Sequence, residues 1–105
     1  MTARTRVWRK VESIAVVEET ERVTVLDLVH DDARPIVLTG SALAVWNEID
    51  GESDQSEITR RLASTFDQDA AGMLEDVAAF LRHLESAHVI RSFEISRAEQ
   101  ERRAS

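Results

Sequence analysis

Three histidines are the residues of this 105-residue sequence best suited to metal binding or proton transfer. His83 and His88 lie five positions apart, which separates them by about 140° on a helix. A zinc-binding helix instead places two histidines at i and i+4, on one face. His30 stands beside Asp31 and Asp32, where the polarity of a turn explains it better than ligation does. We therefore expect no metal site.

Groups for covalent or acid–base catalysis are also scarce. The sequence has no cysteine, which excludes disulfides, thiolate ligands and a cysteine nucleophile. It contains no glycine-rich phosphate loop and no Gly-x-Ser-x-Gly motif. Asp76, next to Met73, Val77 and Phe80, could accept a hydrogen bond or pair with a partner's Lys or Arg, although a solvated helix residue is the commoner explanation. We expect neither an enzyme nor a cofactor.

The formal net charge of −7 is unevenly distributed. Residues 1–10 carry +4, whereas residues 11–96 carry −12. So acidic a body repels phosphate backbones and attracts basic or neutral partners, although solubility alone explains the same charge. The segment 70–88 offers Arg82 as its single cation, and Arg60–Arg61 is the only basic pair of the body. We therefore expect no nucleic-acid partner.

Hydrophobic segments long enough for a membrane are missing from the sequence. No apolar run approaches the roughly 20 residues that a membrane helix needs, and the first ten residues are not followed by the apolar stretch of a signal peptide. We expect a cytoplasmic protein without a membrane partner.

The first half of the chain has strand patterns. Residues 12–17 form a short strand candidate, and residues 22–28 alternate, with Val23, Val25 and Asp27 on one face. Residues 35–38 are predicted to return as a third strand. Pro35 cannot donate a ladder hydrogen bond, which places it at a strand start or on a sheet edge. Such an edge leaves backbone groups that another chain can use.

The second half has helix patterns. Thr39, Gly40 and Ser41 cap a short helix that carries Leu43, Val45, Trp46 and Ile49, and Gly51 is expected to end it. A second helix begins after an N-cap at Ser53 or Asp54. Its apolar stripe is Ile58, Leu62 and Phe66. The third helix is expected over residues 70–88, with an apolar stripe wider than packing on one partner requires.

Strands followed by helices in separate blocks predict an α+β fold. We expect a winged helix-turn-helix-like domain, with a three-stranded antiparallel sheet followed by three helices, over residues 11–95. Residues 1–10 are expected to be a flexible basic terminus, although Val7–Trp8 could pair as a strand, and residues 96–105 a flexible tail.

The junction between sheet and helices resembles the PqqD family. Residues 38–42 are similar to the family's "Leu-Asn-x-x-Ala", which follows a strand. The next residues, Val45–Gly51, are similar to its "Ile-Trp-x-x-Leu-x-Gly". The similarity continues through residues 58–62, Phe66 and residues 76–84, and spans about residues 12–90. Thr39 departs from the commoner Asn, and residues 87–90 replace the usual Gly-Leu ending.

The resemblance implies a RiPP recognition element, a domain that binds the leader of a ribosomally synthesised precursor peptide without catalysis. In that family the leader adds a strand to the third strand of the wing and lies against the third helix. The expected peptide-binding residues are Pro35, Ile36, Val37, Leu38 and Thr39 in the strand, and Met73, Asp76, Val77, Phe80 and His83 in the helix. Positions 77, 81 and 84 are expected to face the core.

A free-standing chain of this kind is similar to the leader-binding proteins of lasso-peptide pathways. The partners implied are a precursor peptide, a separate leader peptidase and a downstream cyclase, although other family members serve pyrroloquinoline quinone or radical-enzyme pathways. Two further functions stay open from the residues alone. They are a winged-helix DNA-binding regulator and a small accessory subunit of an enzyme complex.

Overall fold

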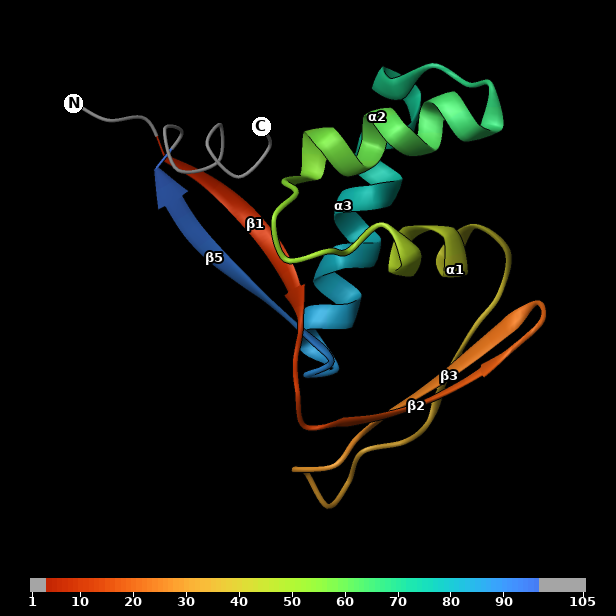
Figure 1. Ribbon diagram of the computed structural model, residues 1–105, viewed down its shortest axis with the longest axis vertical. Helices are drawn as coiled ribbons and strands as arrows, with labels where there is room; N and C mark the ends of the chain where they lie inside the picture. The colour runs from red at the N-terminus through yellow and green to blue at the C-terminus, as the bar shows by residue number, and fades with distance from the viewer. Residues whose placement is uncertain (1–3, 97–105) are drawn as a thin grey trace.

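The structure of the chain is a computed structural model that describes residues 4–96. Its elements follow the predicted order, with one additional strand at each end (Figure 1). In chain order they are β1 (Arg4–Lys10), β2 (Ile14–Glu19), β3 (Arg22–Asp27), β4 (Ile36–Leu38), α1 (Gly40–Asn47), α2 (Gln55–Phe66), α3 (Ala70–Ser86) and β5 (Ile90–Ser96). The α+β fold with a three-stranded antiparallel sheet and three helices is confirmed.

The three-stranded sheet has the order β2-β3-β4, and all pairs are antiparallel. Thr24 lies opposite Val17 on β2 and Val37 on β4, so these three residues share one face. Val23, Val25 and Asp27 point to the other face and are buried, as their alternation predicted. The helices lie on that inner side of the sheet (Figure 1).

The helix starts depend on side-chain caps. Asp54 is the N-cap of α2, and its carboxylate accepts from the Glu57 N–H at 2.8 Å, while the Glu57 carboxylate accepts from the Asp54 N–H at 3.2 Å. This reciprocal capping box satisfies two backbone donors that a helix start leaves without partners. Asp69 caps α3 by accepting from the Ala71 N–H at 3.3 Å.

Two helices are shorter than their sequence patterns suggested. α1 ends at Asn47 instead of continuing to Gly51, which has φ +83 in the loop that follows. The Asp50 carboxylate accepts from the N–H groups of Glu52 and Ser53, which stabilises this loop in place of another helical turn. α3 ends at Ser86, and His88 adopts φ 66 just beyond it.

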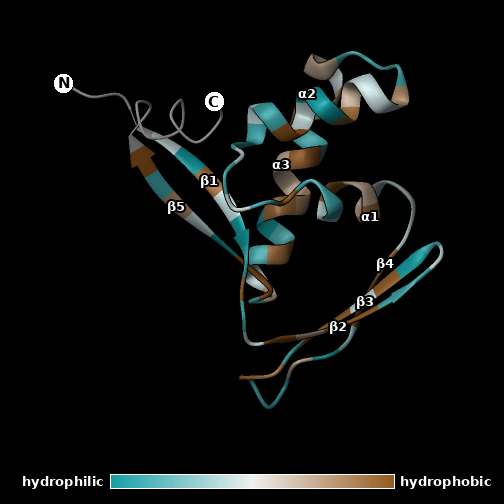
Figure 2. Cartoon of the chain, viewed as in Figure 1, coloured by the Kyte–Doolittle hydropathy of each residue, from teal (hydrophilic) through white to brown (hydrophobic). Residues whose placement is uncertain are grey.

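The core lies between the sheet and the three helices. Trp46 of α1, Leu38 of β4, and Ile58 of α2 are each at most 2% exposed. Val77, Leu81 and Leu84 of α3 are buried too, as expected for its core-facing stripe. Hydrophobic residues are concentrated along β3, α1 and α3 (Figure 2).

The expectation of a flexible N-terminus is wrong for Arg4–Lys10. These residues form β1, which pairs with β5 over seven positions, so the folded domain begins before residue 11. Val7 and Trp8 are buried, and the Trp8 backbone exchanges hydrogen bonds with Ser53 and Gly51, which holds the strand in place. Ser96 ends β5, and the rest of the expected tail lies outside the described residues.

Candidate functional site

The free edge of β4 is the first component of the candidate site. β4 pairs with β3 on one side, and no described strand pairs with its other side. Ile36 and Leu38 point inward, whereas Val37 is 56% exposed on the outer face. Pro35 directly precedes the strand, as its missing N–H predicted, and Thr39 is the N-cap residue of α1.

The backbone of α3 does not approach β4 closely. α1 contacts both β4 and α3, but no Cα atom of β4 lies within 8 Å of one of α3. An added strand would lie about 4.8 Å from β4. The backbone of α3 therefore does not occupy the place that such a strand would take.

A cavity of about 420 Å³ between the three helices is the second component. α3 contributes four of the expected residues to its lining, namely Met73, Asp76, Val77 and Phe80. Met73 and Phe80 are half-buried at the edge of the core, and Asp76 is exposed at the rim. The cavity is a mainly apolar space with one carboxylate, suited to an apolar side chain that has a polar or cationic neighbour.

The expected residues are not all gathered in this cavity. His83 lies outside the lining, although its ring centroid is 6.3 Å from that of Phe80. No residue of β4 lines the cavity either. The connection between them is α1, whose first turn follows Thr39 at once and supplies Ser41 and Ala42 to the cavity wall. The first turn of α1 therefore connects the end of β4 to the cavity wall.

Sequence reasoning missed part of the cavity wall. Phe66 was predicted only as part of the apolar stripe of α2, yet it is 43% exposed and lines the cavity with Gln68. The physical reason is the left-handed conformation of Asp67 (φ 52), which ends α2 and turns the chain toward α3. Gly72 also belongs to the lining, on the exposed side of the first turn of α3.

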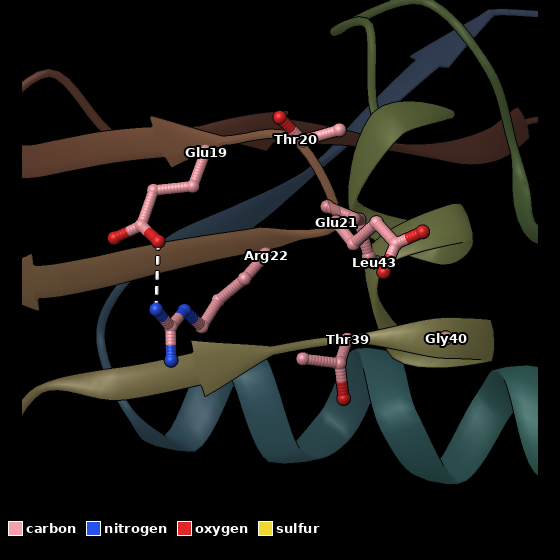
Figure 3. Close-up of a pocket in the computed structure, with 7 residues that line it drawn as sticks. All are labelled: Glu19, Thr20, Glu21, Arg22, Thr39, Gly40 and Leu43. Atoms are coloured by element: carbon pink, nitrogen blue, oxygen red, sulfur yellow. Dashed lines mark hydrogen bonds and ion pairs between the residues drawn. The ribbon is translucent and has the colours of Figure 1, made fainter.

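A further cavity of about 930 Å³ lies beyond the end of β4 (Figure 3). Thr39, Gly40 and Leu43 form one side of it, and the turn between β2 and β3 forms the other. Within the turn, Arg22 donates to the Glu19 carboxylate at 2.7 Å, a bond that raises the pKa of Arg22. The exposed carboxylate of Glu21 lies nearby and forms no ion pair with the described residues.

Among residues 4–96, no group of three or more His, Asp or Glu side chains is arranged to hold a metal ion. The same residues include no helix that is both long and apolar enough to span a bilayer.

Comparison with known proteins gives a family match over most of the chain. The family model described as coenzyme PQQ synthesis protein D (PqqD) matches residues 5–90, which is most of the chain. The chain belongs to the PqqD family. The resemblance inferred from the junction at residues 38–51 is thereby confirmed, and the match extends into β1, which the sequence pattern did not include.

A solved structure shows the same fold. TbiB1, in complex with the TbiA(beta) leader peptide, matches with a TM-score of 0.69 at 16% sequence identity. The match covers 79% of this chain and 94% of the TbiB1 chain. A search of curated proteins found no match. This PqqD-family chain and TbiB1 thus share a fold. The ligand of this chain has to be inferred from its own candidate site.

Proposed function

We propose that this PqqD-family chain binds the leader segment of a ribosomally synthesised precursor peptide by strand addition to β4. The observation that carries the proposal is the free edge of β4, which neither a described strand nor the α3 backbone occupies. Backbone pairing at an edge provides affinity without requiring a particular leader sequence. The fold shared with TbiB1, which was solved with a leader peptide, supports this choice.

The groove beside β4 would read leader side chains on two faces. Successive residues of a strand point to opposite sides of a sheet. One set of leader side chains would therefore point toward the 420 Å³ cavity, which Met73 and Phe80 of α3 and Phe66 of α2 border. The other set would lie beside Val37 on the outer face. Apolar anchors in the cavity would supply most of the specificity.

Carboxylates at both ends of the site favour a leader that carries Lys or Arg near its apolar anchors. Asp76 stands at the rim of the helical cavity, and Glu21 stands beside the end of β4 (Figure 3). Each could pair with a cation whose methylene stem packs on apolar neighbours, such as Leu43 next to Glu21.

The chain would act by delivery rather than by chemistry. We infer that it presents the leader-bound precursor to a separate leader peptidase and a downstream cyclase, the set of partners that a lasso-peptide pathway would provide. A protein that holds only the leader leaves the rest of the precursor free for these enzymes.

Fluorescence polarisation with labelled leader peptides from precursors encoded beside the gene tests the function. We expect saturable binding at micromolar protein or tighter, with random duplex DNA ignored. Binding of DNA without binding of any leader would instead identify a winged-helix regulator. Binding of neither would leave an accessory subunit as the remaining function.

A further inference from the structure

A basic cleft of about 370 Å³ lies on the ribbon formed by β1 and β5. Its lining is Arg9, Lys10, Val11, Glu12, Ser13, Arg91 and Phe93. None of these residues belongs to β4 or α3, so the cleft is separate from the proposed leader site. Arg9 and Arg91 supply two guanidinium groups to the cleft against one carboxylate, that of Glu12, in a chain whose residues 11–96 carry −12.

The two arginines of the basic cleft oppose each other. Arg9 and Arg91 are direct partners in the antiparallel register, an arrangement in which like charges destabilise a strand pair. Neither guanidinium forms an ion pair with a carboxylate among residues 4–96. On the same ribbon, by contrast, Arg6 is paired with Glu94 at 3.3 Å.

Aromatic surface accompanies these charges. Phe93 is 39% exposed, and the Arg9 guanidinium lies 5.0 Å from its ring centroid, held as a cation over the ring. Lys10 follows Arg9 in the strand and points to the other face of the ribbon, where its ammonium lies 4.6 Å from the buried Trp46 ring; burial lowers the pKa of Lys10, although Glu18 partly opposes the shift. In a cleft of this composition, carboxylates of a ligand would bind between the two arginines. An apolar side chain of the same ligand would pack on Phe93.

We propose that the basic cleft binds a carboxylate-rich segment of a partner protein. Charge complementarity selects this occupant, since an acidic segment would remove the repulsion between Arg9 and Arg91. The acidic remainder of the chain would repel the long phosphate backbone of a nucleic acid that extended beyond the cleft. Leader and acidic partner could then be bound at the same time, each on its own strand system.

Peptide binding tests this proposal directly. The probe is a short fluorescein-labelled peptide of glutamates flanking one phenylalanine, compared with the same peptide carrying glutamines and with random duplex DNA. We expect saturable binding of the glutamate peptide that weakens as salt rises. Arg91→Gln should weaken it about fivefold. Arg60→Gln, an equal charge change at an exposed position of α2, should leave it unchanged.

Thermal unfolding provides a second readout that needs no partner. Arg91→Gln should raise the unfolding midpoint by about 1–3 °C at low salt, because it removes the opposed charge, and the gain should vanish at high salt. The proposal is overturned if the glutamine peptide binds equally well, if DNA binds more tightly, or if Arg60→Gln weakens binding as much as Arg91→Gln. Leader binding is measured on the same samples, so its loss would count against the proposed function separately.

Discussion

At the scale of single residues, Asp27 holds the loop that leads into β4. Its carboxylate accepts from the Val29 N–H at 2.9 Å and lies 2.5 Å from His30 Nδ1. The bond from Val29 lowers the pKa of Asp27, burial opposes this shift, and His30 adds to it. Because the pKa is lowered in the folded state, the ionised carboxylate of Asp27 stabilises the fold. This contribution is fully present above the unfolded-state pKa of about 3.9. That contribution is lost as the pH falls through the folded-state pKa.

Asp27→Asn should therefore be less stable than the unmodified chain near neutral pH, and the difference should shrink as the pH falls below about 4. Urea unfolding at a series of pH values measures this, with exposed Asp31→Asn as the matched control. A difference that stayed constant through the acidic range would show that the Asp27 charge does not stabilise the loop.

Phe80 tests the helical cavity at the same scale. Because its half-buried ring lines the cavity, Phe80→Ala should weaken leader binding by about tenfold. Leu74→Ala is the control, since Leu74 lies on the same helix, is 41% exposed and does not line the cavity. Equal leader affinities for the two variants, measured by fluorescence polarisation, would exclude the cavity as a leader subsite.

At the scale of elements, proline distinguishes the two possible orientations of β4. Along an antiparallel edge, N–H groups of successive residues point alternately toward the neighbouring strand and away from it. Proline at the outward position should leave the chain folded and weaken leader binding about tenfold, whereas proline at the inward position should break pairing with β3. Val37→Pro and Ile36→Pro cover both cases, and circular dichroism reports folding. Unchanged leader binding by both variants, each folded, would contradict pairing at this edge.

The β1–β5 ribbon gives a prediction about stability. Trp8 is 6% exposed and belongs to the core, so Trp8→Ala should lower the free energy of unfolding by about 3–5 kcal/mol. Urea unfolding measures the change. If β1 were a loosely attached terminus, the variant would instead unfold at the same urea concentration as the unmodified chain.

The elements differ in how far the sequence could predict them. Alternation at Val23, Val25 and Asp27 predicted β3, and the capping residues at Ser53 or Asp54 predicted the start of α2, because both signals are local. β1 contains two apolar residues, Val7 and Trp8, within a polar and charged stretch. Its partner strand begins 80 positions after β1 ends. The cavity wall at Phe66 depends on the turn at Asp67. Asp67 adopts a left-handed conformation, which the residue type alone does not predict.

At the scale of the whole molecule, charge is separated between two surfaces. The proposed leader site has Asp76 and Glu21 near it, whereas the basic cleft carries the guanidinium groups of Arg9 and Arg91. If the leader is selected by Lys or Arg, its affinity should fall as salt rises, because screening weakens exposed pairs. Fluorescence polarisation across a salt series checks this, and a flat series would leave apolar anchors and backbone pairing as the sources of affinity.

Backbone hydrogen exchange of β4 with and without a bound leader peptide tests the central claim most directly. Strand addition predicts that outward amides of β4, either that of Val37 or those of Ile36 and Leu38, become protected when the leader binds. Amides of β2, the opposite edge of the sheet, should exchange as before. Strand addition would be contradicted if the leader bound saturably while every β4 amide exchanged at the same rate as in the protein without leader.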